Sequence, residues 1–204
     1  MGIEGIGASV ARKEDKRFIT GKGRYTDDIA LKDTTFAFFV RSPHAHATIV
    51  SIDTAAAKAA PGVVDVLTGA DFAEDKIGGL ICGWMIHSKD GSPMKAGAHP
   101  ALALDRVRHV GDQVAVVIAE TRDQARDAAE LVAVEYDILP AVTDPARAAE
   151  PGAPTLHDVA PDNVIFDWTI GDKDATDAAF ASAAHVVKLD IVNNRLAPNP
   201  MEPR

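Results

Sequence analysis

The sequence of 204 residues has little of several things that would point to a function. It contains one cysteine, Cys82, and aromatic side chains make up only 5% of its residues. One cysteine excludes an intrachain disulfide framework and cannot supply the four thiolates that an iron–sulfur cluster normally takes. No apolar run approaches the roughly 18 residues of a membrane-spanning helix. Residues 1–4 show no basic or apolar leader, so we expect no signal peptide and a reducing, cytoplasmic location.

The chain also lacks an excess of positive charge. Lys and Arg total 21 against 30 Asp and Glu, which gives a formal net charge of −9. Nonspecific binding to nucleic acids or to anionic membranes needs a basic face, so neither partner is expected. The hydrophobic content of 47% is that of an ordinary globular protein, and the length suggests one to one and a half domains.

What the sequence does contain is an alternation of strand and helix signals. The run at 113–119 is almost continuously apolar, which is typical of a strand buried on both faces. Thr121 and Gln124 fit a capping box for a helix that ends near Leu131. Further strands are predicted at 35–41, 47–52, 63–67, 107–109 and 132–136, with a short helix at 55–60. These strand–helix–strand units predict an α+β domain with a mixed sheet.

The pattern divides the chain into three parts. Residues 1–28, interrupted by glycine and mixed charge, read as an N-terminal arm, and residues 29–145 as the α+β domain. Within that domain, residues 73–100 form a long Gly- and Pro-rich loop, which suggests a docking surface. Residues 146–204 begin as a linker and continue with a strand at 163–170, a helix near 174–183 and a strand at 186–192. They predict the incomplete start of a second domain, less protected from hydrogen exchange than residues 114–119.

Candidate catalytic and metal-binding groups are few. His44 and His46 lie two residues apart, but no third ligand follows at a diagnostic spacing, so a turn with partly exposed histidines competes with a metal site. Cys82 with His87 or His99 offers a nucleophile and a base, yet no nucleophile motif surrounds it. A buried structural thiol beside Trp84 is the alternative.

The remaining motifs favour structural roles. The segment from Gly21 to Arg24 lacks the spacing of a phosphate loop, and the early glycines do not fit a dinucleotide fingerprint. Turn glycines and acidic helix caps or solvated turns are the simpler interpretation. The residues concerned are Gly2, Gly5, Gly7, Gly21, Gly23, Asp27, Asp28, Asp172 and Asp174. His109, His157 and His185 show no partner in the sequence. No catalytic, cofactor-binding or metal-binding residue is therefore assigned.

Several segments are informative when they are read together, because each alone is a weak signal and their order along the chain is specific. The segments are RKED at 12–15, TGKGRYTDD at 20–28, VRSPHAHA at 40–47, PGVVDVLTGAD at 61–71, DRVRHVGDQVA at 105–115, AAELVAVEY at 128–136 followed by Leu139 and Pro140, NRL at 194–196 and PMEPR at 200–204. In this order they resemble the large subunits of molybdenum hydroxylases, the family of xanthine dehydrogenase, aldehyde oxidase and aerobic carbon monoxide dehydrogenase. The arm and the last segments are most similar to bacterial carbon-monoxide-dehydrogenase-like subunits.

The resemblance implies a fold and a setting. Residues 29–145 would form the α/β hammerhead domain, and residues 146–204 a linker and the first elements of the molybdopterin-binding domain. The family's complexes use molybdenum on molybdopterin cytosine dinucleotide, [2Fe–2S] clusters and FAD. Their partners would be the rest of the large subunit, an iron–sulfur small subunit and a FAD-carrying medium subunit. The family's catalytic motifs match no position here, so this chain alone is expected to hold no cofactor and to be inactive.

Three functions remain open from the sequence. The first is a structural scaffold within a molybdenum-dependent oxidoreductase. The second is a non-enzymatic assembly module that keeps a hammerhead domain. The third is a small hydrolase that uses Cys82 or a histidine.

Overall fold

The computed structural model describes residues 5–8, 11–29 and 31–193, and the chain divides into two compact units. One unit comprises residues 1–34 and 186–204, and the other residues 35–185. The first unit contains α1 (Asp15–Ile19) and the 3-10 helix η1 (Thr26–Asp28), and the Phe18 and Tyr25 rings stack with centroids 5.5 Å apart. None of its described side chains is buried. The interpretation of an arm without a core of its own therefore fits its described part.

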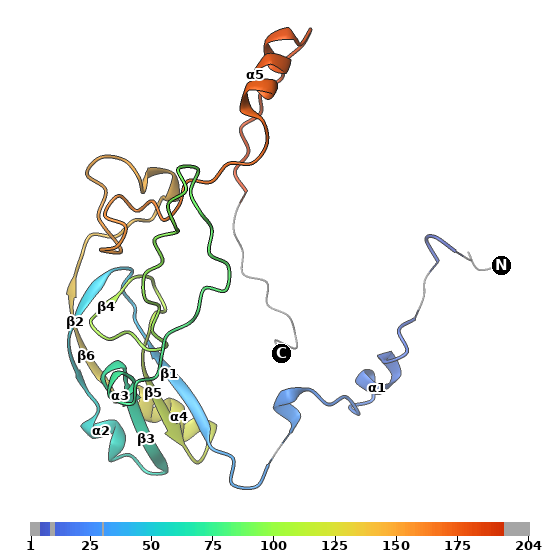
Figure 1. The fold of residues 1–204 in the computed structure, drawn as a ribbon. Helices are drawn as coiled ribbons and strands as arrows, with labels where there is room; N and C mark the ends of the chain where they lie inside the picture. The colour runs from blue at the N-terminus through green and yellow to red at the C-terminus, as the bar shows by residue number, and fades with distance from the viewer. Residues whose placement is uncertain (1–4, 9–10, 30, 194–204) are drawn as a thin grey trace. The chain divides into compact units, whose positions relative to one another are not determined.

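The second unit is built on two small antiparallel sheets (Figure 1). In the first sheet, β5 (Gln113–Ala119) lies between β1 (Phe36–Arg41) and β3 (Val63–Thr68). In the second, β2 (Ala47–Asp53) lies between β4 (Arg106–Val107) and β6 (Ala133–Ile138). Each predicted strand of the 35–136 range is present within one or two residues.

The predicted mixed sheet is wrong. Every strand pair of the described residues is antiparallel. The reason lies in the two helical crossovers, α2 (Ala55–Lys58) and α4 (Arg122–Ala129), since each leads from a strand of one sheet to a strand of the other. A strand–helix–strand pattern predicts parallel neighbours only when both strands join the same sheet. Sequence periodicity does not show which sheet a strand joins.

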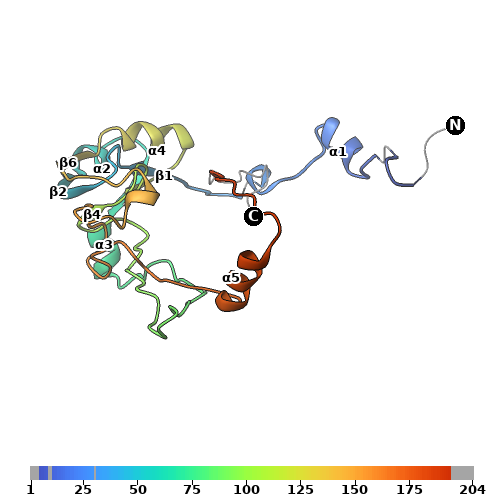
Figure 2. The same cartoon turned by 90° about the horizontal axis from the view of Figure 1, so that it is seen from above.

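The core lies where α4 packs against the first sheet and where the two sheets meet (Figure 2). Ala128 and Ala129 of α4 pack with Ala115 and Val117 of β5, and their small side chains bring the helix close to the strands. Val114 belongs to a second cluster that includes residues of β2 and β4. Residues 114–117 are all buried, which confirms the prediction that β5 is covered on both faces.

Local signals position the helices. Thr121 caps α4, because its Oγ1 accepts a hydrogen bond from the Gln124 backbone N–H at 3.2 Å. The Gln124 side chain does not close the predicted box on the backbone; its Oε1 accepts from the Thr121 hydroxyl. Thr68 and Asp71 form a capping box that starts α3 (Gly69–Glu74). The Thr68 hydroxyl and N–H both donate to Asp71, which lowers the pKa of that carboxyl.

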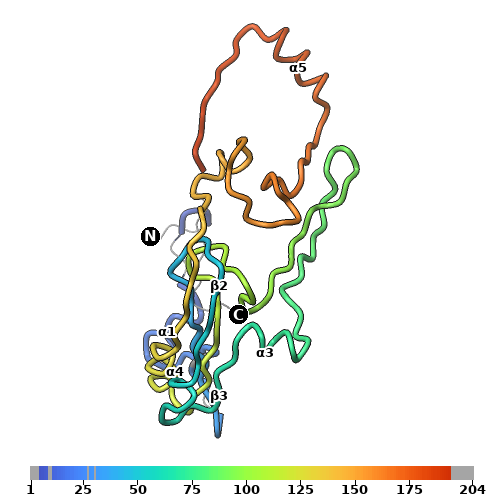
Figure 3. The backbone as a smooth tube through the Cα atoms, turned by 90° about the vertical axis from the view of Figure 1, so that its left-hand side faces the viewer, coloured from blue at the N-terminus to red at the C-terminus, as the bar shows by residue number. Residues whose placement is uncertain are grey.

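The rest of the second unit is mostly irregular. The long loop, predicted at 73–100, occupies residues 75–105 between α3 and β4, because α3 extends through Glu74. It runs beyond the strands beside the segment around 150–170 (Figure 3). Two further helices follow, the 3-10 helix η2 (Pro145–Arg147) and α5 (Lys173–Ser182), the second of which confirms the helix predicted near 174–183. The strands predicted at 163–170 and 186–192 are absent from these described segments. Neither segment pairs with a neighbouring strand that would fix it in a ladder.

Candidate functional site: a basic pocket beside the long loop

The candidate site is a pocket of about 460 Å³ between the long loop, the segment after β4 and the 156–165 segment. We call it the basic pocket and define it by six lining residues: Leu80, His99, Arg106, Arg108, His157 and Ile165. Basic groups gather here although the chain as a whole carries a net charge of −9.

Pairing between β4 and β2 positions the two arginines. Arg106 lies opposite Thr48 in the antiparallel ladder, and the chain then turns at Arg108, whose N–H donates to Asp112 Oδ2 at 2.9 Å. The Arg108 guanidinium donates through Nε to the Leu156 carbonyl at 3.0 Å and through Nη1 to the Arg106 carbonyl at 3.2 Å. Arg108 therefore ties the strand end to the 156–165 segment through neutral acceptors.

Arg106 has a different environment. Its Nη1 lies 3.7 Å from Asp158 Oδ1, a loose ion pair whose carboxylate is largely exposed. Its Nε is buried and has no hydrogen-bond partner among the residues that the structure describes. A buried donor that lacks an acceptor is costly, so the arginine pair leaves hydrogen-bonding capacity unused at the pocket wall.

The neck of the long loop closes one side of the pocket. The Leu80 N–H donates to the His99 carbonyl oxygen at 2.7 Å. A Cβ at Gly79 would lie 2.4 Å from that same oxygen. Only glycine therefore lets the chain at residue 79 pass this close to the His99 carbonyl.

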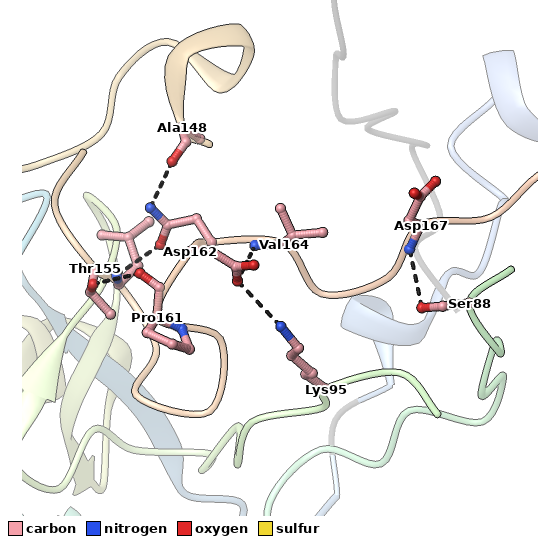
Figure 4. Close-up of polar contacts among 10 residues, drawn as sticks. Ser88, Lys95, Ala148, Thr155, Pro161, Asp162, Val164 and Asp167 are labelled. Atoms are coloured by element: carbon pink, nitrogen blue, oxygen red, sulfur yellow. Dashed lines mark hydrogen bonds and ion pairs between the residues drawn. The ribbon is translucent and has the colours of Figure 1, made fainter. Parts of the chain in front are cut away.

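A set of polar contacts holds the tip of the long loop against the 162–167 segment (Figure 4). We call this set the clasp; its members are Ser88, Lys89, Lys95, Asp162 and Asp167. Two backbone bonds cross it, from Lys95 N to Ile165 O at 3.0 Å and from Lys89 N to Asp167 O at 2.7 Å.

Side chains of the clasp add ion pairs. Lys95 Nζ lies 3.3 Å from Asp162 Oδ1, and Lys89 pairs with Asp167, whose N–H donates to Ser88 Oγ. The Val164 N–H and then Lys95 lower the pKa of Asp162, and Asp167 raises the pKa of Lys89. The charged side chains of the clasp are all exposed, so the clasp depends on contacts that salt screens.

Asn163 folds the segment that carries His157. Its side-chain amide donates to the carbonyls of Ala148 and Pro154, and its oxygen accepts from the Leu156 N–H at 3.0 Å. Its φ of 57° lies in the left-handed region that asparagine tolerates better than most residues. One side chain thus ties the backbone at Ala148, Pro154 and Leu156 together beside the pocket wall.

His157 is half-buried, and its surroundings disfavour the charged imidazolium. Desolvation lowers the pKa of His157 first, and the positive charge of Arg108 and the neighbouring His99 lower it further, whereas Asp158 raises it. Gly97 packs against the ring, because a Cβ there would lie 3.1 Å from Nδ1. The pocket thus presents a neutral imidazole beside a guanidinium near pH 7.

The histidines of 44–46 have separate structural places. His46 is only 4% exposed and its Nδ1 lies 2.7 Å from the Pro140 carbonyl oxygen, whereas its Nε2 has no partner among the described residues. His44 is half-buried, and its ring meets the edge of Tyr136 at 5.0 Å between centroids. The expectation of exposed histidines is therefore wrong for His46, because the link to Pro140 draws it inside.

The buried thiol predicted beside Trp84 is also wrong. Cys82 is exposed, and its Sγ lies 3.3 Å from the Trp84 carbonyl oxygen. His99 lines the same pocket as Cys82, whereas His87 forms an isolated bridge with Pro93 in the loop tip. Cys82 lies in an irregular loop without an apolar layer over it, which explains why the prediction failed.

The other singled-out residues mostly act in turns and caps. Gly5, Gly7 and Gly21 have positive φ, and Gly23 packs on Phe18, whereas Gly2 lies outside the described residues. Acidic caps are confirmed at two positions: Asp28 accepts from Tyr25 N–H, and Asp172 caps α5 through Ala175 N–H. Asp174 lies in the first turn of α5, Asp27 in η1, and His185 is exposed beyond α5.

Sequence reasoning missed the basic pocket. It left His109 and His157 without partners, yet both line the pocket with His99, and His109 lies 3.7 Å from Asp112. No spacing rule links positions 80, 108 and 157, because an irregular loop and a turn bring them together. Arg106 and Arg108 were visible only as parts of a family segment.

The donor side chains of the described residues do not fit the metal and iron–sulfur groups that the resemblance implies. Within residues 5–8, 11–29 and 31–193, no three His, Cys, Asp or Glu side chains gather in a way that fits a metal ion. One cysteine in the whole chain does not fit a [2Fe–2S] cluster. In the same described residues, no helix has the length and apolar character needed to cross a membrane.

Comparison with known families decides the assignment. Residues 20–140 match the family model described as aldehyde oxidase and xanthine dehydrogenase, a/b hammerhead domain. The chain belongs to this family. The hammerhead domain is thus the two-sheet α+β structure described above, and the arm's last residues fall within the match. The predicted boundaries at 28 and 145, and the molybdopterin-domain identity of 146–204, stay predictions.

Individual relatives place the chain within molybdenum hydroxylase large subunits. It is 43% identical to the carbon monoxide dehydrogenase large chain of Afipia carboxidovorans, over 98% of this chain and 25% of that one. It is 40% identical to the nicotine 6-hydroxylase large subunit of Paenarthrobacter nicotinovorans, over 98% and 23%. A solved CO dehydrogenase from Oligotropha carboxidovorans superposes with a TM-score of 0.72 at 42% identity, over 89% of this chain and 23% of that one. The hammerhead chain spans about a quarter of these relatives.

Proposed function

We propose that this chain serves as the N-terminal structural part of the large subunit of a molybdenum-dependent hydroxylase, and that it packs against the rest of that subunit. The catalytic assembly would be a cytoplasmic oxidoreductase with molybdopterin cytosine dinucleotide, [2Fe–2S] clusters and FAD. An iron–sulfur small subunit and a FAD-carrying medium subunit would complete it. The chain itself contributes scaffold and surface, without a complete active site.

One observation carries the scaffold role: both tryptophans of the chain are exposed. Trp84 is 80% exposed and Trp168 54%, and they lie near the two sides of the clasp. Tryptophan is enriched at the energetic centres of protein interfaces. Several other exposed apolar residues accompany them: Leu80, Ile81, Met85, Phe166 and Ile170. An apolar set of this kind in an acidic chain supports a large protein partner.

The test is complementation in two pieces. The remaining three-quarters of the carbon monoxide dehydrogenase large chain of Afipia carboxidovorans is produced as a separate tagged polypeptide together with this chain. We expect copurification and a blue shift of the tryptophan emission. Trp84→Ser with Trp168→Ser should weaken recovery at least about tenfold, whereas Ile138→Ser, an exposed apolar change on β6, should not. A chain that stays monomeric beside this partner contradicts the scaffold role.

The second candidate is an assembly module that binds a partner outside any oxidoreductase. The exposed long loop favours it, because such a loop suits docking without catalysis. Metal and flavin analysis of the complex captured with genomic neighbours separates the two candidates. Molybdenum, iron and flavin in fixed ratio support the hydroxylase, and a stable complex without them supports the assembly module. Activity that disappears with Cys82→Ala would instead revive the hydrolase.

A further inference from the structure

The basic pocket has a use of its own beyond the scaffold role. We propose that it binds a carboxylate attached to an apolar group, with Arg108 facing the carboxylate and Leu80 and Ile165 facing the apolar part. The inference does not rest on the proposed function, since it concerns groups that this chain holds by itself.

The charges around the pocket leave one guanidinium without a carboxylate partner among the described residues. The carboxylates near the pocket already have partners: Asp112 accepts from Arg108 N–H and lies near His109, and Asp162 pairs with Lys95. Asp158 is paired loosely with Arg106. Arg108, in contrast, meets carbonyl oxygens through Nε and Nη1. Among the described residues, carbonyl dipoles rather than a carboxylate therefore meet its guanidinium, and a carboxylate is the planar group that a guanidinium binds best.

The shape and polarity of the pocket also bear on its occupant. The pocket holds about 460 Å³, within the range of small-ligand sites, and its walls contain more apolar than polar surface. Leu80 is 66% and Ile165 41% exposed, so their apolar surface is available to an occupant. An inorganic anion would leave the apolar surface of the pocket exposed to water, whereas a carboxylate that carries an aromatic or aliphatic group would cover it.

The pKa of His157 responds to its surroundings. Desolvation lowers the pKa of His157 most, Arg108, His99 and His46 lower it further and Asp158 raises it, so the balance of these influences disfavours the charged imidazolium. A bound carboxylate reverses this balance and raises the pKa of His157. A rise in the pKa of His157 thus indicates a bound carboxylate, and this readout is independent of the measured affinity.

The experiment follows the histidine ring signals of the whole chain by NMR at pH 7 and constant ionic strength during titration with benzoate. We expect saturable shifts at His157 and His99 with a Kd on the order of 1 mM. Arg108→Gln should weaken binding about tenfold, and Arg126→Gln, the same change at an exposed arginine of α4, should leave it within about twofold. Acetate, which lacks the apolar body, should bind about tenfold more weakly than benzoate.

A second variant guards against a folding defect in Arg108→Gln. Ile165→Asp places a carboxylate at an exposed position of the pocket wall, so it should abolish benzoate binding and raise the pKa of His157 without any ligand. If the pKa does not rise although thermal unfolding is unchanged, the pocket does not sense a carboxylate and the proposal fails.

Two sources of such a group are distinguished by further probes. N-acetylphenylalanine presents the carboxyl end of a polypeptide, and its amide lacks the charge. Binding of benzoate alone supports a free small carboxylate, and preference for N-acetylphenylalanine over both benzoate and the amide supports a chain terminus. Tighter binding of inorganic phosphate, or equal shifts in Arg108→Gln, overturns the proposal.

Discussion

Two regions of the second unit are stabilised in different ways. The strand region, residues 35–74 and 102–138, contains nearly all of the buried apolar side chains. The outer region, residues 75–101 and 141–185, is fully described yet buries a single apolar side chain, Ala160. Polar contacts hold it instead: the clasp, the Asn163 amide and the Arg108 bonds. Apolar burial resists solvent and salt, whereas exposed polar contacts exchange readily with water.

The comparison explains where the two kinds of function lie. A region that already buries most of its apolar side chains in its own core exposes little apolar surface to a protein partner. The outer region exposes both tryptophans and forms much of the basic pocket, and its lack of a buried core predicts the low local stability that binding segments share. The predictions below probe this division with matched changes in the two regions.

The largest effect is expected from removal of buried volume. Val117→Ala in β5 deletes two methyl groups from a fully buried site and should lower the free energy of unfolding by about 2 kcal/mol. Val159→Ala, the same change at a 53% exposed site of the outer region, should lower it by less than about 0.5 kcal/mol. Urea unfolding measures both. Equal losses would mean that the outer region shares the core's cooperativity.

Loss of a helix cap should have a smaller effect, and the two regions offer a closely matched pair of caps. Thr121 caps α4 and Asp172 caps α5, each through one side-chain oxygen that accepts a backbone N–H. Thr121→Ala should lower the free energy of global unfolding by about 1 kcal/mol, because α4 packs on the core. Asp172→Ala should reduce helicity within α5 alone, since no residue of α5 is buried. Circular dichroism together with urea midpoints tests the pair, and a shifted midpoint in Asp172→Ala contradicts local opening.

The same division explains how much the sequence could predict. In the strand region, periodicity and β-branched runs predicted β1, β2, β3 and β5 within about a residue, and the capping signal at Thr121 predicted the start of α4. Sheet membership escaped prediction, because nothing local to the 63–68 segment shows that it joins β5 rather than β2. The family resemblance supplied the fold that local signals could not, because it rests on the order of segments along nearly the whole chain.

In the outer region, local signals predicted much less. The strand predicted at 163–170 had suitable side chains but no partner strand, and sequence alone does not supply one. The basic pocket depends on Gly79 passing the His99 carbonyl and on Arg108 reaching Leu156, contacts between segments with no regular period. Only the helix capped by Asp172 carried a local signal strong enough to predict it.

A third prediction concerns the turns around Asn163. Asn163→Ala removes the acceptor of Leu156 N–H and the donor to Ala148 and Pro154. Hydrogen exchange at Leu156 should accelerate roughly tenfold, because half-buried polar groups lose their partners. Exchange within residues 114–119 should not change. Thr155→Ala, which removes only the bond to the Pro161 carbonyl, serves as the milder control, and faster exchange in β5 would show that the regions are coupled.

The smallest effect is a dependence of stability on pH that comes from His157. Because the folded structure lowers the pKa of this imidazole below its usual value of about 6.5, unfolding takes up a proton at mildly acidic pH. Its contribution to stability is therefore full above about pH 6.5 and is lost as pH falls from there through the lowered folded-state pKa. His157→Asn should remove this part of the pH dependence, and His185→Asn, at an exposed site, should not. If the outer region opens by itself, the difference will be seen in hydrogen exchange around residues 156–160 while the urea midpoint of the strand region keeps its pH profile. A difference in the global midpoint would instead show that the pocket wall unfolds together with the core.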